Sequence, residues 1–282
     1  MLIDSHVHVF SQAFTQKRNN LIKEDLTFKD MYSNAKSSMS TTDILLHSMD
    51  VNNIDYSVIV SIGWENYNIA KESNNYLIKS AKMHSDRLGA LVGINPNWGD
   101  LAIQEVKRCL EQGALGIGEM HPDTQKFKLN NKKLLFPLMD FIKKHKLPML
   151  MHSSEPIGRQ YPGKGTITPK KILAFSKLFP DNVIIAAHWG GGLPFYYLLK
   201  ELASFPPKLY FDTAASTLLY TSDIFEAVVN IIGEDNILFG SDFPLVIQRK
   251  IIQQIGNTEL TQVQKNKILG ENAKNLLGIS VK

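Results

Sequence analysis

The chain has 282 residues, 44% of them hydrophobic, and a formal net charge of +4. Its basic residues are mixed with acidic and amide ones rather than clustered, which argues against a nucleic-acid or membrane-binding surface. A single cysteine, Cys109, excludes an internal disulfide and fits a reducing compartment. The N-terminal apolar run is broken by Asp4 and resembles no signal peptide, and no stretch approaches the ~18 apolar residues of a membrane span. We therefore expect a cytoplasmic protein.

Short apolar runs recur along the chain and predict the strands of a buried sheet. They are rich in β-branched and aliphatic residues and often close on Gly, Pro, Asn or Ser, as buried parallel strands do. The eight runs cover residues 2–10, 54–62, 87–96, 114–122, 147–154, 182–190, 208–216 and 236–244.

The segments between these runs carry apolar residues at helical spacing. The predicted helices cover residues 41–53, 73–86, 100–113, 131–146, 168–180, 193–205 and 222–235, with a last helix at 260–278. Alternation of strand and helix eight times predicts an α/β fold, a (β/α)8 TIM barrel, as a single domain over residues 1–282 with a C-terminal helix. An open doubly wound sheet is the alternative.

Two segments are too long for plain connections. Residues 11–40 follow the first predicted strand and residues 153–167 follow the fifth. In a barrel both would leave from the C-terminal rim, where active sites lie, so we interpret them as rim loops or a lid. A disordered surface insertion is the alternative for the first.

The opening stretch MLIDSHVHVF places His6 and His8 two residues apart at the end of a strand. Residues i and i+2 of a strand face the same side, so both imidazoles are able to bind one ion, although such a pair also occurs on ordinary strands. His152 and His188 end the fifth and sixth predicted strands, and Asp242 closes the eighth. In a barrel these residues converge on one rim.

Imidazoles and a carboxylate buried under loops require a partner, and a divalent cation is a suitable one. A donor set of three or four histidines and one aspartate suits zinc best, and iron, manganese or cobalt less selectively. Glu119, in GIGEMHP, is a further candidate ligand, able to bridge to a second ion. Two other roles are open to Glu119: it accepts a hydrogen bond that orients a ligand imidazole, or it forms a structural salt bridge. We therefore expect one or two ions.

Candidate substrate contacts lie at or just past other predicted strand ends. They are Trp64, Asn97, Arg159 and Trp189. Arg159 has the fork geometry that holds a carboxylate, and the tryptophans suit the wall of an apolar pocket. A solvated loop arginine and helix-to-barrel packing are the alternatives.

The stretch GRQYPGK, residues 158–164, matches the first part of a phosphate-binding loop. The next residue is Gly165, so the hydroxyl that would bind magnesium is missing. We do not expect nucleotide binding there.

Taken together, DSHVH, His152, His188 and SDFP resemble the amidohydrolase superfamily, and within it the amidohydrolase-related branch that includes aminocarboxymuconate-semialdehyde decarboxylase. The resemblance runs from Ile3 to the helix after Asp242. It implies that His6, His8, His152 and Asp242 are metal ligands, and that His188 is either another ligand or the general base.

The resemblance also shows one departure from the binuclear members of the superfamily. Neither GIGEMHP nor LPMLMHS offers the lysine that is carboxylated and bridges two metals in those members. Glu119 is the residue able to take its place, as a strand-four glutamate does in the similar TatD-like nucleases. Without that role for Glu119, the site is mononuclear.

Our leading functional expectation is a metal-dependent hydrolase that uses a metal-bound hydroxide on a small amide, ester or lactone. Asp242 would take the proton from the water, and His188, if it is not a ligand, would stabilise the oxyanion or act as a second base. The first alternative is a lyase on the same scaffold, a non-oxidative decarboxylase or hydratase of a planar carboxylic acid. The remaining alternatives are a TatD-like nuclease acting on phosphodiesters and a non-catalytic metal-holding barrel. We expect a small-molecule partner, no nucleic acid and no membrane, and leave open a homodimer.

Overall fold

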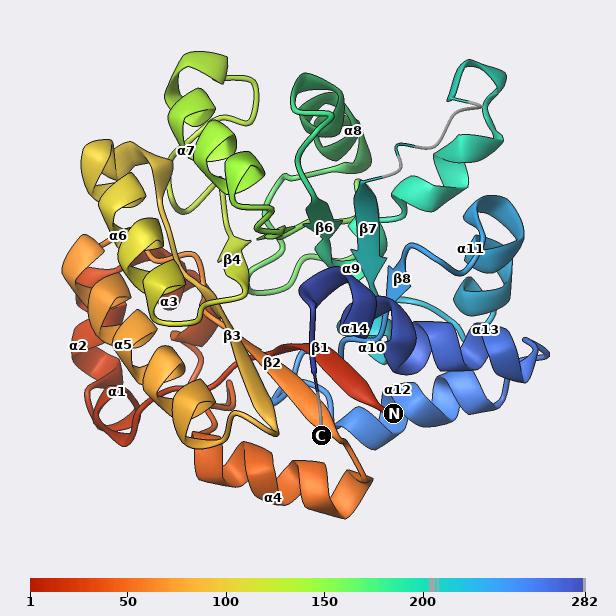
Figure 1. The fold of residues 1–282 in the computed structure, drawn as a ribbon, viewed down its shortest axis with the longest axis horizontal. Coiled ribbons are helices and arrows are strands. Elements are labelled where there is room, and N and C mark those ends of the chain that lie inside the picture. The colour runs from red at the N-terminus through yellow and green to blue at the C-terminus, as the bar shows by residue number, and fades with distance from the viewer. Residues whose placement is uncertain (203–205, 207, 281–282) are drawn as a thin grey trace.

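The computed structural model describes residues 1–202, 206 and 208–280. Eight parallel strands are hydrogen-bonded in chain order and helices surround them, as Figure 1 shows. Each strand lies inside one of the eight apolar runs predicted from the sequence. The strands are β1 (Ile3–Val7), β2 (Tyr56–Val60), β3 (Leu88–Val92), β4 (Gly116–Met120), β5 (Met149–Met151), β6 (Ile184–Ala186), β7 (Leu209–Asp212) and β8 (Ile237–Leu238). The predicted TIM barrel and single domain are therefore confirmed.

Helices connect and cover the strands. The helices are α1 (Gln12–Gln16), α2 (Arg18–Glu24), α3 (Leu26–Tyr32), α4 (Thr42–Asn52), α5 (Tyr67–Met83), α6 (Asp100–Glu111), α7 (Lys132–Lys144), α8 (Pro169–Leu178), α9 (Ala187–Gly190), α10 (Ser216–Leu219), α11 (Ile224–Ile232), α12 (Gln248–Gly256), α13 (Gln262–Asn266) and α14 (Asn272–Leu277), with shorter 3-10 or π turns η1 (Pro96–Trp98), η2 (Leu193–Leu198), η3 (Lys200–Leu202) and η4 (Lys267–Glu271). No helix in the described residues is long and apolar enough to cross a bilayer.

The structure differs from the predicted elements in several places. The helix predicted at 193–205 is instead two 3-10 turns, η2 and η3, and residues 203–205 lie outside the described residues. A short helix needs one buried face, but Leu198 is 72% exposed. Residues 11–40 contain three short helices, α1 to α3, rather than only irregular chain. The helices α9, α10 and α12 were not predicted either.

The barrel closes between its first and last strands. The Ser5 amide donates to the carbonyl of Phe239 at 2.8 Å, and the His8 amide donates to that of Phe243 at 2.7 Å. The Asp242 amide donates to the carbonyl of His6 at 2.9 Å. These bonds hold the segment after β8 directly against β1, so Asp242 lies beside the two N-terminal histidines.

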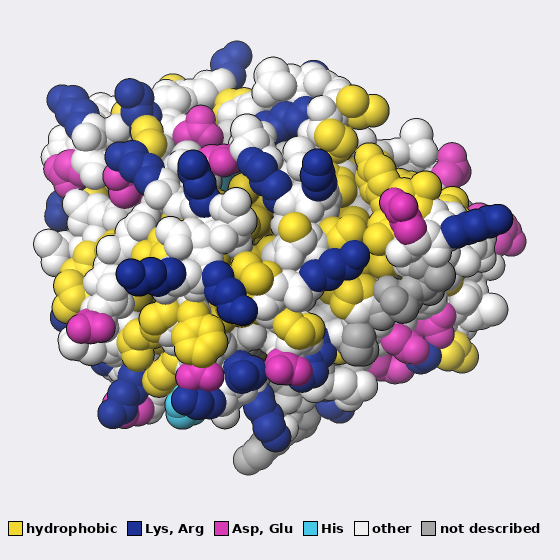
Figure 2. Space-filling model, turned by 90° about the horizontal axis from the view of Figure 1, so that it is seen from above, with side chains coloured by type: hydrophobic (Ala, Val, Ile, Leu, Met, Phe, Trp, Pro, Cys, Tyr) yellow, Lys and Arg dark blue, Asp and Glu magenta, His cyan; other side chains and the backbone are white. Residues whose placement is uncertain are grey.

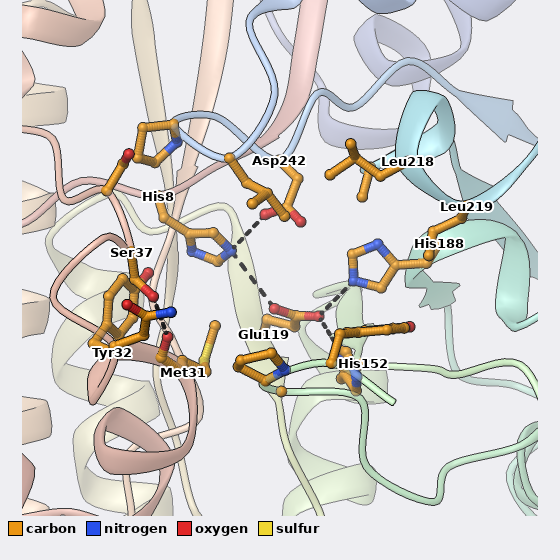
Figure 3. A pocket seen from close by; sticks show the side chains of 18 of the residues that line it. His8, Met31, Tyr32, Ser37, Glu119, His152, His188, Leu218, Leu219 and Asp242 are labelled. Atoms are coloured by element: carbon orange, nitrogen blue, oxygen red, sulfur yellow. Dashed lines mark hydrogen bonds and ion pairs between the residues drawn. The ribbon is translucent and has the colours of Figure 1, made fainter. Parts of the chain in front are cut away.

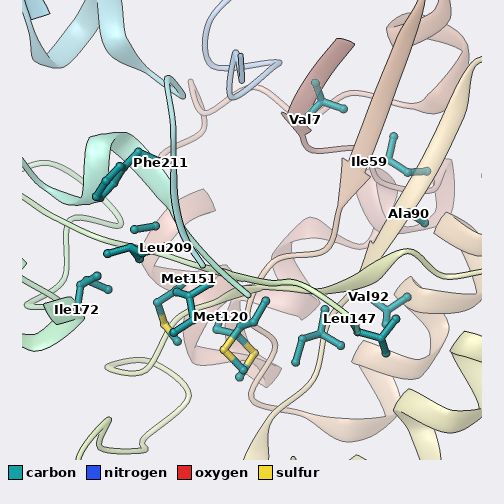
Figure 4. Packing of buried hydrophobic residues seen from close by; sticks show 14 of the residues in the cluster. Val7, Ile59, Ala90, Val92, Met120, Leu147, Met151, Ile172, Leu209 and Phe211 are labelled. Atoms are coloured by element: carbon teal, nitrogen blue, oxygen red, sulfur yellow. The ribbon is translucent and has the colours of Figure 1, made fainter. Parts of the chain in front are cut away.

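Side chains of the strands alternate between two apolar layers. On β2, Ile59 packs in the large layer between strands and helices, whereas Val58 and Val60 belong to a smaller cluster with residues of other strands and of α14. Figure 4 shows members of the large layer, including Ile59, Val92 and Phe211. Fully burying one such side chain contributes roughly 1.5–3 kcal/mol. This framework holds the carboxyl ends of all eight strands at one rim.

The outer surface has mixed charge. On the face shown in Figure 2, Lys and Arg side chains are scattered among acidic and uncharged ones rather than gathered into a stripe. The absence of a nucleic-acid partner stays a prediction.

Candidate metal centre and cavity

The predicted ligands meet at the carboxyl-terminal rim of the barrel. His6 lies on β1 and His8 just beyond it, and their rings are in edge-to-face contact with centroids 4.9 Å apart. Glu119 lies on β4, His152 directly follows β5, His188 follows β6, and Asp242 follows β8. All six residues are nearly buried, with exposed fractions of 9% or less for the whole residue.

Glu119 lies at the centre of this group. Its Oε2 is 3.6 Å from Nε2 of His6 and 3.6 Å from Nε2 of His8. Its Oε1 is 2.9 Å from Nδ1 of His152 and 3.6 Å from Nε2 of His188. Figure 3 shows the carboxylate of Glu119 between His8 on one side and His152 and His188 on the opposite side. The two oxygens of Glu119 therefore face two different pairs of histidines.

Two triads of ligand atoms in the described residues are close enough to hold a metal ion. One is His6, His8 and Glu119, and the other is Glu119, His152 and His188. Asp242 lies beside the first triad, since its Oδ1 is 3.4 Å from Nε2 of His8.

Each histidine directs one nitrogen toward Glu119 and donates from the other to a fixed acceptor. This arrangement sets the tautomer and ring orientation of metal ligands in proteins. The acceptors are Asp212 Oδ2 for His6 (2.8 Å), the Val60 carbonyl for His8 (3.0 Å), the Lys164 carbonyl for His152 (3.1 Å) and the Ala214 carbonyl for His188 (3.1 Å). The inward nitrogens are thereby kept available for a cation.

The electrostatics of the group also fit a cation. Burial alone would raise the pKa of Glu119, but the imidazoles, His121 first among them, hold it well below its ordinary range. Burial lowers the pKa of His8 and His152, which favours the neutral imidazole that binds metal. Burial would also lower the pKa of His188, but Glu119 and Asp242 raise it to about 9. Carboxylates that attract positive charge so strongly, beside imidazole donors, suit a divalent ion.

The local chain is shaped to place His188. After β6 ends, His188 and Trp189 adopt left-handed backbone angles, with φ of 54° and 58°. Gly191 follows with φ of +63°, and a Cβ there would lie 2.3 Å from the carbonyl oxygen of Ser154. Only glycine fits this close approach, so the GGG stretch at 190–192 lets the turn after β6 pack against the segment after β5.

Sequence reasoning missed two residues of the group. Asp212 closes β7 in the run KLYFDTAAS, and this strand-end carboxylate is the signal that would have found it. His121 follows β4 and was not assigned a role, yet it stacks on His152 at 4.2 Å between centroids. Its Nε2 is 3.2 Å from Oε2 of Glu119.

A cavity of about 400 Å³ opens above the group. Its floor contains His8, Glu119, His121, His152, His188 and Asp242. Apolar side chains form much of its wall, and two solvent-exposed cationic side chains also line it. The apolar wall includes Met31, Tyr32, Leu218, Leu219 and Leu245, and the cations are Lys36 and Arg159.

The predicted substrate contacts divide into two groups. Arg159 and its neighbour Tyr161 line the cavity. Trp64 is fully buried and stacks on Phe28, with 5.6 Å between centroids. Trp189 is also fully buried, and its Nε1 donates to Ser216 at 3.0 Å.

Asn97, the fourth predicted contact, donates to the Gln125 carbonyl at 2.8 Å. Trp64, Trp189 and Asn97 therefore pack around the barrel end rather than line the cavity, and only Arg159 among the four lies on its wall.

Comparison with known proteins places this geometry in context. A family model described as Amidohydrolase matches residues 3–279. The chain is 21% identical over 276 residues to the 2-amino-3-carboxymuconate-6-semialdehyde decarboxylase of Dictyostelium discoideum, covering 84% of this chain and 76% of that protein. It is 23% identical over 250 residues to the gamma-resorcylate decarboxylase of a Polaromonas strain, covering 75% and 76%.

Solved structures share the fold. The 5-carboxyvanillate decarboxylase of Sphingomonas paucimobilis matches with a TM-score of 0.79, 16% identity and 99% coverage of both chains. A 5-carboxyvanillate decarboxylase of Novosphingobium aromaticivorans, solved with manganese and 4-hydroxy-3-methoxy-5-nitrobenzoic acid, matches with a TM-score of 0.75 and 15% identity, covering 99% of this chain and 96% of that chain.

These findings correct the leading functional expectation. We expected a hydrolase of amides, esters or lactones, whereas the curated relatives are decarboxylases. The expectation was wrong because the ligand residues indicate only a metal centre, and one such centre serves both kinds of reaction.

Proposed function

Because the chain belongs to the amidohydrolase family, with the family model matching nearly its whole length, we propose that it is a metal-dependent decarboxylase of a small, planar carboxylic acid. The observation that carries the proposal is the cavity. Its floor bears the imidazole and carboxylate group centred on Glu119, and its wall is largely apolar. The decarboxylase relatives support the same reaction class.

We propose that Glu119 is shared by two metal sites. His6, His8, Asp242 and Glu119 would hold one ion, and Glu119, His152 and His188 would hold the other. Zinc and manganese both accept this mixture of nitrogen and oxygen donors. A bound divalent ion would supply Lewis acidity to oxygen atoms of the substrate.

Side chains that line the cavity bind the substrate and shield it from water. Arg159 and Lys36 attract an anionic acid, and the guanidinium of Arg159 matches a carboxylate bidentately. Tyr32, Leu218 and Leu219 flank a planar ring and exclude water from it. Moving a carboxylate from water into this apolar enclosure favours the loss of neutral carbon dioxide.

The reaction replaces the carboxylate with a proton, so the site needs a group that delivers one to carbon. Asp242 lies on the floor, its side chain is 12% exposed, and it contacts His8. We assign the proton transfer to Asp242, which takes up one proton from solvent and delivers it to the carbon that bears the carboxylate. The electron pair of the broken C–C bond forms the new C–H bond, and the carboxylate leaves as neutral carbon dioxide. His188 presents Nε2 to the same floor, because its Nδ1 donates to Ala214.

The test is turnover of a panel of acids by protein loaded with manganese or zinc. The panel contains 2,6-dihydroxybenzoate, 5-carboxyvanillate and 2-amino-3-carboxymuconate semialdehyde, which are the acids of the relatives. Chromatography of substrate and product is expected to show loss of one carboxyl group from at least one acid. Turnover of none of them, with the metal bound, would contradict the proposal.

A further inference from the structure

The segment between β5 and α8, residues 152–168, forms one side of the cavity. Its residues Arg159, Tyr161, Pro162 and Gly163 line the wall. The tip is solvent-exposed, with Ile157 80% exposed. This wall carries Arg159, a predicted substrate contact, so what holds the wall in place bears on substrate binding.

Lys164 is buried inside this segment. The residue is only 5% exposed, and its Nζ donates to the carbonyls of Ile157 at 3.1 Å and Arg159 at 2.9 Å. The ammonium also lies 5.5 Å from the centroid of the Tyr161 ring. In the part of the chain that the structure describes, no carboxylate lies within ion-pair distance of it. A buried charge requires satisfied donors, and here the carbonyls of the turn supply them.

The backbone of the same residue holds a candidate metal ligand. The Lys164 carbonyl accepts the hydrogen bond from Nε2 of His152 at 3.1 Å. Gly165, with φ of +64°, follows directly, and a Cβ there would lie 2.9 Å from Oδ2 of Asp123. Asp123 accepts from the hydroxyl of Thr166 at 2.9 Å, which anchors the base of the segment. The turn is thus fixed at its base by Asp123 and at its tip by Lys164.

We propose that Lys164 is a positioning residue that clamps the 157–163 turn against the cavity. Its ammonium fixes the carbonyls on either side of Gly158, and this places Arg159 and Tyr161 on the substrate wall. Its carbonyl orients His152 through a contact that side-chain substitution leaves intact. The consequence for substrate rests on the proposed function, whereas the clamp itself is testable without turnover.

The first test is limited proteolysis of the manganese-loaded protein by trypsin, with cleavage sites assigned by mass spectrometry. Cleavage after Arg159 requires the turn to open. In Lys164→Met, which keeps the stem and removes the ammonium, we expect this cleavage to be at least about tenfold faster, as for loss of a charge-assisted hydrogen bond. Lys170→Met is the matched control, because Lys170 is exposed on α8. It should cleave at the wild-type rate.

The second test separates positioning from a general structural effect. With the acid of the panel that wild-type protein turns over fastest, Lys164→Met should raise KM by about tenfold and change kcat by less than about threefold. Metal content per chain should be unchanged, since the Lys164 carbonyl remains. If Lys164→Met does not fold, Lys164→Gln is the second variant. Its cleavage after Arg159 is expected to be faster than in wild type by the same factor.

Equal rates of cleavage after Arg159 in Lys164→Met and wild type would contradict the proposal that Lys164 holds the turn. Loss of metal from the variant would also contradict it. If wild-type protein turns over no acid of the panel, the proposed function fails, and the proteolysis still decides whether Lys164 holds the turn.

Discussion

Asp212 accepts a hydrogen bond from Nδ1 of His6 at 2.8 Å, across the mouth of the barrel from β7 to β1. The other carboxylate oxygen of Asp212 accepts from the amides of His188 at 2.8 Å and Ala214 at 3.0 Å. One buried side chain therefore orients a ligand from each of the two proposed metal sites. Partners of this kind set the direction and basicity of ligand imidazoles.

Substituting Asp212→Asn should weaken metal binding. The amide nitrogen is unable to accept from Nδ1 of His6, so the ring loses its fixed tautomer and direction. We expect metal affinity, measured by competition with a chromogenic chelator, to fall roughly 10- to 100-fold. Asp86→Asn, at an exposed position, is the matched control. Wild-type affinity in Asp212→Asn would show that this carboxylate does not support the ligands.

The shared role of Glu119 predicts a metal count. Wild-type protein purified without chelators should contain two divalent ions per chain by inductively coupled plasma mass spectrometry. Glu119→Gln should contain one or none, because the glutamine lacks the charge and one of the two acceptor oxygens. Manganese-loaded wild type should also show spin-coupled pairs by electron paramagnetic resonance. Retention of two ions in Glu119→Gln would contradict the bridging role, and one ion in wild type would leave Nε2 of His188 free as an acid–base group.

Much of the fold was predictable because the strand runs and helical periods are long and regular. The eight strands fall within their predicted runs since buried parallel strands are almost entirely apolar. The prediction of a helix at 193–205 was wrong because apolar spacing alone does not show whether a helix face will be buried. Leu198 of this segment is exposed to solvent.

The candidate site was predictable only in part. Topology brings strand ends together, so HxH, His152, His188 and Asp242 could be grouped from their positions alone. Asp212 and His121 were left out because an isolated acid or histidine at a strand end looks ordinary without its neighbours. The positions of Trp64 and Trp189 depended on packing, and both lie among aromatic neighbours, Phe28 and Phe225.

The single thiol should be unreactive in the folded protein. Cys109 is fully buried on α6, and burial, with Glu105 beside it, raises the pKa of its thiol. Because the thiolate is the reactive form, Ellman's reagent should label less than about one tenth of the thiol in native protein over an hour. In guanidinium chloride the reagent should label all of it. Rapid labelling of native protein would contradict the packing of α6 against the barrel.

A buried ion pair predicts pH-dependent stability. Burial would raise the pKa of Glu105, but Arg108 and Asn74 lower it below its ordinary value of 4.5. Arg108 Nη2 is 2.7 Å from Oε1 of Glu105, whose side chain is 1% exposed. A carboxyl with a depressed folded-state pKa stabilises the protein above the pKa of the unfolded chain, and this is lost as the pH falls through the folded value.

Urea unfolding at several pH values provides the measurement. Glu105→Gln should lower the free energy of unfolding by about 1–3 kcal/mol near pH 7, as for a charge-assisted hydrogen bond. The difference from wild type should shrink as the pH falls below 4.5, where the carboxyl of the unfolded chain takes up a proton before the folded-state carboxyl does. A difference that stays constant down to pH 3 would show that the charge of Glu105 is not the cause.

The most direct test of the account is whether the metal-loaded protein releases carbon dioxide from a carboxyl group. Each acid of the panel, labelled with carbon-13 at its carboxyl group, is incubated with manganese-loaded protein, chelator-treated protein and Asp242→Asn, and the headspace gas is analysed by mass spectrometry. We predict labelled carbon dioxide from at least one acid with the loaded wild type, and release at about one hundredth of that rate or slower in the other two samples. A loaded wild type that releases none, or a chelated protein that releases it equally fast, would contradict the account.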